Sequence, residues 1–131
     1  MKRPFFHFLR FLRQEAIKEL LRIVKPNGLV LIYVWAFEQE ERNFTEQDIF
    51  VPWNLQYKFE DEETIQDLSD NSNKKPGEVF LNEAKKTVVY KRYYHVFKKG
   101  ELEDIIKELK LAEIVESYYD HANWCVKIRK L

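Results

Sequence analysis

Residues 29–35 read Leu-Val-Leu-Ile-Tyr-Val-Trp, a run with no polar alternation. Such a run is typical of a strand that is covered on both faces, as in a parallel sheet. The residues before it, Lys-Pro-Asn-Gly at 25–28, combine a helix-ending proline with an Asn-Gly turn. Further upstream, apolar side chains recur at helical spacing. We therefore predict an amphipathic helix from about residue 9 to 24 that leads into a buried strand at 29–35.

The residues around this helix leave two alternatives open. A helix followed by a buried strand is half of a βαβ unit, and residues 4–8, Pro-Phe-Phe-His-Phe, are the only candidate for the strand that should precede it. The helix itself is rich in Arg and Lys. A segment at residues 4–24 that lies on a membrane surface, or that targets an organelle, is therefore an alternative to a helix packed on a sheet.

The rest of the chain falls into two parts. Residues 37–58 read as irregular, and an acidic run followed by Ser, Asn, Lys, Pro and Gly predicts a flexible linker over 59–87. Residues 88–97 have strand composition, and Gly100 opens a second helix whose early acids suit the positive helix start. Strands at 111–119 and 124–129 form an antiparallel hairpin across a four-residue turn. The pattern predicts the closing half of an α/β sheet, without its opening half.

Composition excludes several classes of function. The chain has 131 residues, and its 22 basic and 22 acidic side chains give a formal net charge of zero. This balance argues against a free-standing nucleic-acid binder held mainly by charge. Three glycines cannot form a glycine-rich cofactor loop, and no apolar run approaches a membrane span. The single Cys125 and three scattered histidines argue against a disulfide or a metal site and suit a reducing compartment.

Four ordered blocks carry a family resemblance. They are LIYVWAFEQE at 31–40, QDIFVPW at 47–53, YYHVFKKGEL at 93–102 and SYYDHANWCV at 117–126. These blocks resemble the eukaryotic tRNA wobble-uridine (5-carboxymethyluridine) methyltransferase family, and the fourth is most similar to the methyltransferase domain of AlkB homologue eight. The resemblance covers residues 12–58 and 88–131. It implies a cytoplasmic location, with the nucleus as a second compartment.

The resemblance implies a fold of class α/β, namely the C-terminal half of a seven-stranded, Rossmann-like S-adenosylmethionine-dependent methyltransferase sheet that ends in an antiparallel hairpin. Residues 29–36 would be strand five, and the hairpin would be strands six and seven. The family's first strands and its glycine-rich cofactor loop have no counterpart in these residues. We therefore expect residues 1–131 to be a partial methyltransferase domain, with segments at 9–58, 59–87 and 88–131. We do not expect this chain alone to bind S-adenosylmethionine or to be active.

The family reaction implied by the resemblance transfers a methyl group to the carboxylate of 5-carboxymethyluridine in tRNA. A carboxylate is already ionised at pH 7, so no general base is required and no catalytic residue is assigned. The base must leave its stack and be held by aromatic faces and polar edges. Several residues in or beside the resembling blocks have side chains that suit stacking, base-edge contacts or contact with an anion. They are Trp35, Gln47, Asp48, Trp53, Lys91, Arg92, Tyr94, His95 and Asn123.

Several of these residues also have a structural alternative, and for His95 it is that of an ordinary strand residue. Trp35 suits core packing at a strand end, Trp53 suits packing of a lid, and Asn123 suits a plain turn. Tyr93 and Tyr94 must point to opposite faces of a strand, so one of them is expected to be structural. Cys125 is expected to be a packing residue, with nothing beside it to lower the pKa of its thiol.

The resemblance also implies partners. They are the tRNA anticodon loop and either a missing N-terminal half or a full-length homologue. The family's small zinc-binding activator subunit pairs with the opening half of the fold, so we do not expect it to bind this fragment. A strand with one open edge favours oligomers or aggregation. The alternative function is that of a non-catalytic truncated isoform that acts as a binding module, and the chain is expected to be either such an isoform or a gene-model fragment.

Overall fold

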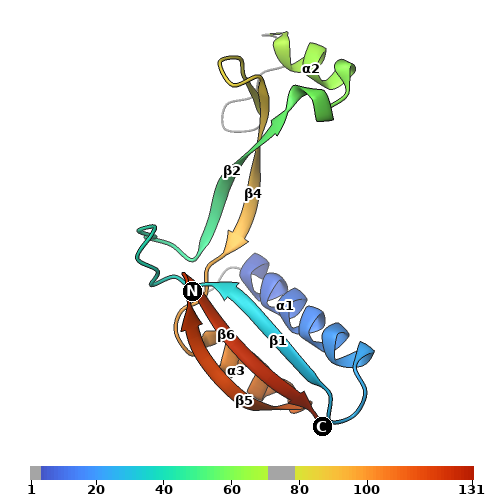
Figure 1. Cartoon of the computed structure of the whole chain (residues 1–131), viewed down its shortest axis with the longest axis vertical. Helices are drawn as coiled ribbons and strands as arrows, with labels where there is room; N and C mark the ends of the chain where they lie inside the picture. Colours follow the sequence, from blue (N-terminus) through green and yellow to red (C-terminus); the bar gives the residue numbers. More distant parts are fainter. Residues whose placement is uncertain (1–3, 71–78) are drawn as a thin grey trace. The chain divides into compact units, whose positions relative to one another are not determined.

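The computed structural model describes residues 4–70 and 79–131, which form two compact units (Figure 1). The first unit, called here the sheet unit, comprises residues up to 47 together with 96–131. The second, the hairpin unit, comprises residues 48–95. Each unit has its own three-stranded antiparallel sheet. The chain is therefore a mixed α/β structure, as predicted, but with two small sheets.

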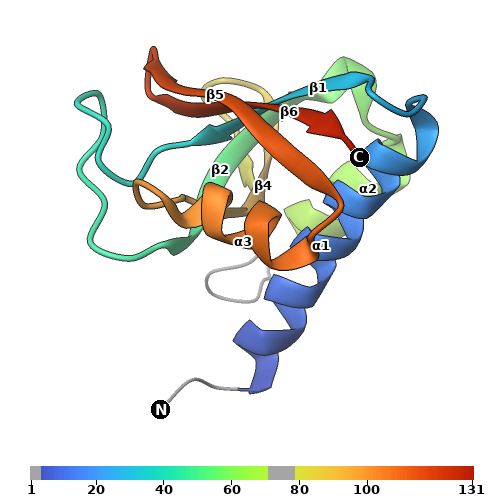
Figure 2. The ribbon, with the colours of Figure 1, turned by 90° about the horizontal axis from the view of Figure 1, so that it is seen from below.

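The sheet unit is built from two helices and three strands. They are α1 (Pro4–Ile23), β1 (Leu29–Trp35), α3 (Glu101–Leu109), β5 (Ala112–Asp120) and β6 (Asn123–Lys130). The strand order is β1-β6-β5, and both pairings are antiparallel. Figure 2 shows α1 and α3 on the same side of this sheet. The predicted helices and the terminal hairpin are thus confirmed.

The core of the sheet unit lies between the two helices and one face of the sheet. Apolar side chains from α1, α3 and β6, together with Phe97 before α3, form one buried cluster, against which the even-numbered side chains of β1 pack. The alternation of β1 and β6 sends every second side chain to this face. The cluster comprises Ile17, Leu21, Phe97, Leu102, Ile105, Ile106, Val126 and Ile128.

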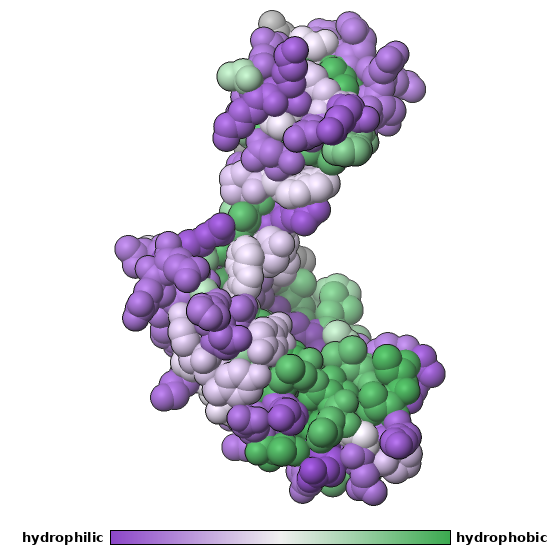
Figure 3. Space-filling model, viewed as in Figure 1, coloured by the Kyte–Doolittle hydropathy of each residue, from purple (hydrophilic) through white to green (hydrophobic). Residues whose placement is uncertain are grey.

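The prediction that β1 is covered on both faces, within a parallel sheet, is wrong for the described residues. Leu29, Leu31 and Tyr33 are 53%, 51% and 46% exposed on the face away from the core. Figure 3 shows apolar surface gathered over the sheet unit. Apolar composition alone cannot distinguish a strand buried on two faces from one whose second face is apolar and uncovered.

The outer edge of β1 is paired only at its C-terminal end. The Ala36 N–H donates to Ala122 O, so the even-numbered backbone groups of β1 face β6 and the odd-numbered ones face outwards. At the outer edge, the Phe97 N–H donates to Trp35 O at 2.8 Å. Among the described residues, the outward N–H and C=O groups of Leu29, Leu31 and Tyr33 have no ladder partner.

Two local predictions in the sheet unit are corrected. Residues 4–8 begin α1 and do not form a strand. The turn of the terminal hairpin contains two residues, His121 and Ala122, and not four, because β5 continues to Asp120 and β6 starts at Asn123. Both turn residues have positive φ, 42° and 70°, which is the backbone geometry of a two-residue hairpin turn. The sequence prediction missed this turn because Asn-Gly or Gly-Gly usually occupies such positions.

The hairpin unit is more ordered than its composition predicted. It contains β2 (Asp48–Gln56), a short 3-10 helix η1 (Tyr57–Phe59), α2 (Glu62–Ser69), β3 (Phe80–Asn82) and β4 (Thr87–His95), with strand order β2-β4-β3. The described part of the expected linker thus contains α2 and β3, and the irregular segment contains β2. Asp61 begins α2 as its N-cap, accepting a hydrogen bond from the Thr64 N–H at 2.7 Å. Residues 71–78 of the expected linker lie outside the described residues.

Pro52 explains why β2 was not predicted as a strand and why it nevertheless forms one. The Val96 N–H donates to Gln47 O and the Tyr57 N–H donates to Lys86 O, so the odd-numbered backbone groups of β2 face β4. The missing N–H of Pro52 therefore faces the outer edge, where no ladder hydrogen bond is lost.

No helix within the described ranges is long and apolar enough to span a membrane. The membrane-surface alternative for residues 4–24 stays an untested prediction.

Candidate functional site

The C-terminal end of β1 brings two predicted substrate residues together. Trp35 lies opposite Asn123 in the register of β1 and β6. The guanidinium of Arg42 lies 5.2 Å from the centre of the Trp35 ring. The Asn123 side-chain amide donates to His121 O at 3.0 Å, so it also stabilises the hairpin turn. Sequence reasoning missed Arg42, whose only signal was a cation a few residues after the strand end.

The loop after β1 is held by Glu38. One of its carboxylate oxygens accepts from the Lys99 backbone N–H at 3.0 Å, and the other accepts from the Trp124 indole N–H at 3.0 Å. The ammonium group of Lys98 lies 5.3 Å from the centre of the Phe37 ring. Glu38 therefore joins the end of β1 to the segment before α3 and to β6. Sequence reasoning did not single out Glu38, although it stands within the first resembling block.

Gln47 is occupied by structural hydrogen bonds. Its side-chain amide nitrogen donates to Val96 O at 3.1 Å and also to a carboxylate oxygen of Glu101. The same oxygen of Glu101 accepts from the Lys98 backbone N–H at 3.1 Å. Gln47 thus fixes the start of α3, where Gly100 precedes the helix with a φ of 85°. A contact between Gln47 and a base edge stays a prediction.

One face of the hairpin unit carries a polar group at the ends of β2 and β4. Asp48 lies opposite His95, and the Asp48 carboxylate is 3.0 Å from the imidazole Nδ1. The Tyr93 hydroxyl donates to the same carboxylate oxygen. Asp48 therefore holds His95 and Tyr93 on this face. Further along it, the Phe50 ring packs edge-on against Tyr93, with centroids 6.1 Å apart, and is 68% exposed.

The opposite face of the hairpin unit carries an aromatic surface. The Arg92 guanidinium lies 3.8 Å from the centre of the Trp53 ring, and the Tyr90 ring lies 5.8 Å from it at an interplanar angle of 36°. Trp53 stays 37% exposed. Tyr94, opposite Ile49 in the register, alternates onto this same face. The prediction that Tyr93 and Tyr94 face opposite sides is thus confirmed by the register.

Tyr90 is anchored by a carboxylate. Its hydroxyl donates to Glu60, and this hydrogen bond, with some burial, raises the pKa of Tyr90 to about 12. The phenol is held in its protonated form because the phenolate would lose the hydrogen bond and face the Glu60 charge. Glu60 therefore supports the ring that lies beside Trp53.

Cys125 packs under a pair of tyrosines, as predicted. It is fully buried in β6, where it lies opposite Tyr33 of β1 and Tyr118 of β5. The hydroxyl oxygens of these two tyrosines are 3.0 Å apart. Burial raises the pKa of the Cys125 thiol. The pKa of Tyr33 is also raised, chiefly by its hydrogen bond with Tyr118. A thiol with a raised pKa is a poor nucleophile, so Cys125 has a packing role.

The predicted substrate residues thus fall into separate groups. Trp35 and Asn123 meet in the sheet unit, and Gln47 of the same unit donates to Val96 O and to Glu101. In the hairpin unit, one face carries the pair Asp48 and His95. The other carries Trp53 with Arg92 and Tyr94. Lys91 lies opposite Pro52 on the first of these faces.

Two of the three glycines, Gly28 and Gly100, lie among the described residues. Gly28 belongs to the turn after α1, where an added Cβ would lie 2.7 Å from Lys25 O, and Gly100 precedes α3 with nothing within 4 Å of an added Cβ. Neither glycine forms a cradle that a cofactor would fill. Over the described parts of the chain, no group of three or more His, Cys, Asp or Glu side chains could hold a metal ion.

Comparisons with known proteins identify relatives. No protein-family model matches the chain. The tRNA (carboxymethyluridine(34)-5-O)-methyltransferase of Schizosaccharomyces pombe is 37% identical over 123 residues, which cover 90% of this chain and 49% of the relative. The enzyme alkbh8 of Xenopus tropicalis, with the same activity in its name, is 29% identical over 91% of this chain and 24% of its own length. The human "Probable tRNA methyltransferase 9B" is 55% identical over 42 residues, 32% of this chain and 9% of the relative.

The chain therefore spans about half or less of the length of the relatives it matches. The family resemblance carried by its four sequence blocks is confirmed. Over about nine-tenths of its length, this chain is homologous to the tRNA (carboxymethyluridine(34)-5-O)-methyltransferases.

Proposed function

We propose that this chain is the substrate-side part of a tRNA methyltransferase that methylates the carboxylate of 5-carboxymethyluridine at the wobble position. The observation that carries the proposal is the similarity over nine-tenths of the chain to enzymes named for this reaction. The sequence predicts that this chain forms the C-terminal half of a methyltransferase sheet. The pairing of β1 with the last strand of a terminal hairpin supports the proposal.

The aromatic face of the hairpin unit suits an unstacked base. Trp53 offers an exposed ring, and Arg92 keeps that ring in place by stacking on it. Bases bind to such surfaces through their π faces, which contributes roughly 1–3 kcal/mol for each base. Among the described residues, Arg92 forms no ion pair within 4.0 Å, so its N–H groups are available to a carboxylate or a phosphate.

The reaction requires positioning more than acid or base chemistry. The substrate carboxylate, with an ordinary pKa near 4, is ionised at pH 7 and needs no proton removed. S-adenosylmethionine, the cofactor that the family resemblance implies, supplies the methyl group when bound. The contribution proposed for this chain is to hold the base by stacking and to pair the carboxylate with a cation. The proposal assigns no contact with this cofactor to the described residues.

The proposal predicts that the full chain distinguishes modified from unmodified RNA. Fluorescence anisotropy with an anticodon stem-loop tests this, because the two ligands differ only by a carboxymethyl group on the wobble uridine. We expect tighter binding of the 5-carboxymethyluridine stem-loop. Absence of binding to either RNA, or equal binding of both, would contradict the proposal.

A second candidate function is that of an interaction module that associates with another methyltransferase chain. The apolar outer edge of β1 favours it, since Leu29, Leu31 and Tyr33 combine exposed side chains with unpaired backbone groups. By contrast, the same sheet face over β5 and β6 carries solvated ion pairs, such as Arg129 with Glu113 at 2.8 Å. The partner surface is therefore the β1 side of the sheet.

Light scattering on the full chain tests this second candidate. We expect the natural chain to associate with itself, and Leu31→Lys to shift it towards a monomer, because a charged edge residue disfavours strand pairing. Leu31 is half exposed, so the substitution should change stability by less than about 0.5 kcal/mol. A monodisperse monomer for the natural chain would contradict the expected self-association through the edge of β1.

A further inference from the structure

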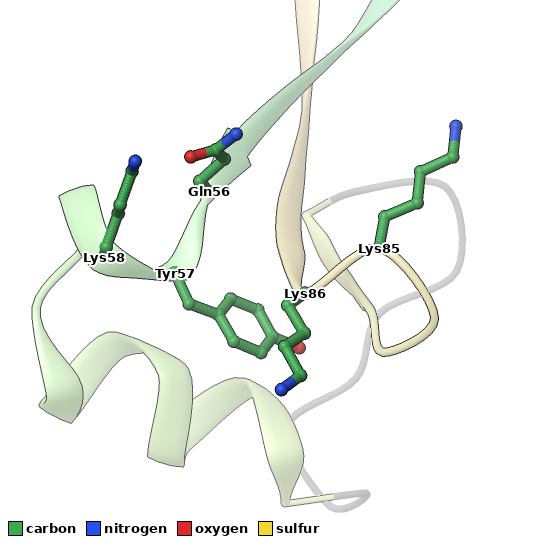
Figure 4. A pocket seen from close by; sticks show the side chains of 5 residues that line it. All are labelled: Gln56, Tyr57, Lys58, Lys85 and Lys86. Atoms are coloured by element: carbon green, nitrogen blue, oxygen red, sulfur yellow. The ribbon is translucent and has the colours of Figure 1, made fainter.

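The end of the hairpin unit contains an open cavity of about 370 Å³ (Figure 4). We call this cavity the tip pocket. Its lining comes from two segments that are far apart in the sequence: the end of β2 with η1, and the turn between β3 and β4. The lining residues are Gln56, Tyr57, Lys58, Lys85 and Lys86.

The backbone fixes the two lysines of the turn. The Tyr57 N–H donates to Lys86 O at 3.0 Å, which closes the end of the hairpin. The Lys85 N–H donates to the side-chain oxygen of Asn82 at 3.1 Å. Lys86 has a φ of 53°, a left-handed conformation that is costly for a residue with a Cβ. Figure 4 shows the Tyr57 ring directed towards Lys86, while Lys58 and Lys85 extend away from the turn.

The tip pocket is cationic without a paired anion. Its lining includes three lysines and no carboxylate. Within the described ranges, none of these lysines forms an ion pair within 4.0 Å, although α2 in the same unit is acidic. Lys58 instead places its ammonium group 4.9 Å from the centre of the Phe59 ring. Three lysines around one open cavity create a positive potential that favours an anion.

We propose that the tip pocket binds the phosphate backbone of the RNA substrate. Lysine ammonium groups, an aromatic ring and an amide are the groups that contact phosphate, sugar and base along a strand. The pocket is open, which suits a passing strand better than an enclosed small molecule. The identity of the RNA as tRNA rests on the proposed function. The zero net charge of the chain is compatible with this site because local charge distribution governs such contacts.

The test neutralises the tip pocket in the full chain. A triple variant, Lys58→Gln, Lys85→Gln and Lys86→Gln, is compared with the natural chain for binding of the anticodon stem-loop over a series of salt concentrations. We expect several-fold weaker binding at low salt. The slope of log affinity against log salt should fall by about 0.7–0.9 for each phosphate that the variant no longer neutralises. Modified and unmodified RNA should be affected equally, because backbone contacts carry no base information.

The matched control neutralises three exposed lysines of the sheet unit, Lys25→Gln, Lys107→Gln and Lys110→Gln, which changes the net charge by the same amount. This control should leave the salt slope unchanged. A second control replaces the three tip-pocket lysines by arginine, which preserves the charge and should preserve binding. Circular dichroism establishes that each variant is folded.

The outcomes separate this proposal from the proposed function. If the natural chain binds neither RNA, the proposed function is wrong and the tip-pocket proposal is overturned with it. If the natural chain binds RNA and the tip-pocket variant keeps the same affinity and salt slope, only the tip-pocket proposal is overturned. If the glutamine variant binds weakly and the arginine variant binds normally, the proposal is supported.

Discussion

Replacing Trp53 by alanine should separate RNA binding from the stability of the hairpin unit. Trp53 is 37% exposed, so a part of its ring is available to a base. Stacking on a full aromatic face contributes roughly 1–3 kcal/mol. With only part of the ring accessible, we expect the lower end of that range, about 1–2 kcal/mol. This corresponds to a roughly 5- to 30-fold loss of affinity for the anticodon stem-loop.

The same substitution also removes packing. It deletes the interaction with Arg92 at 3.8 Å, which contributes about 0.5–1 kcal/mol at an exposed site. It also deletes the interaction with the Tyr90 ring, which contributes about 0.5–1.5 kcal/mol. We therefore expect the free energy of unfolding of the hairpin unit to fall by about 1–2.5 kcal/mol, measured by urea denaturation.

Phe50→Ala is the matched control. Phe50 lies on the same strand but on the opposite face, is more exposed than Trp53, and has its own aromatic neighbour in Tyr93. Its removal should lower stability by about 0.5–1.5 kcal/mol and leave the affinity for RNA unchanged. Anisotropy titrations with the same stem-loop provide the comparison. Equal losses of affinity for the two variants, or no loss for Trp53→Ala, would refute the assignment of the aromatic face to RNA.

Three further predictions concern stability. Ala122→Gly should raise the free energy of unfolding by about 0.5–1 kcal/mol in urea titrations, because a φ of 70° is unfavourable for alanine and free for glycine; a decrease would contradict this. Ile105→Ala should lower it by about 2–5 kcal/mol because this side chain is fully buried, whereas Leu111→Ala, at 43% exposure, should cost much less; similar losses would place the core elsewhere. The pKa of Tyr90 in the folded chain is raised from 10.0 to about 12. Its hydrogen bond to Glu60 should therefore stabilise the folded chain fully below about pH 10, and this stabilisation should be lost as pH rises through about 12. Tyr90→Phe should abolish this pH dependence of stability in alkaline unfolding curves.

Periodicity predicted the sheet unit well. The apolar spacing of α1, the early acids of α3 and the alternation at 124–129 each reflect one buried face, and a single buried face leaves a regular pattern in the sequence. The second face of β1 could not be predicted in this way. Leu29 and Leu31 are apolar whether or not another segment covers them, so composition indicated burial where the described structure shows exposure.

The hairpin unit was largely missed for a different reason. Pro52 and the acidic stretch near α2 are typical of loops, so local propensities predicted no strand. The strand β2 forms because it pairs with β4, whose residues lie about forty positions later in the sequence, and single-residue propensities contain no information about such a pairing. The candidate residues came instead from the family resemblance. It selected Trp53 with Arg92 and Asp48 with His95, which the register brings together. It did not indicate Glu38 or Arg42, whose contacts arise only from tertiary packing.

A segment exchange tests the central claim most directly. The segment of the Schizosaccharomyces pombe enzyme that matches this chain is replaced by residues 1–131, and methyl transfer to tRNA bearing 5-carboxymethyluridine is measured with the soluble, folded product. The account predicts that methyl transfer persists and that Trp53→Ala within the exchanged segment weakens substrate binding. A folded exchange protein that takes up S-adenosylmethionine but transfers no methyl group to this tRNA would contradict it.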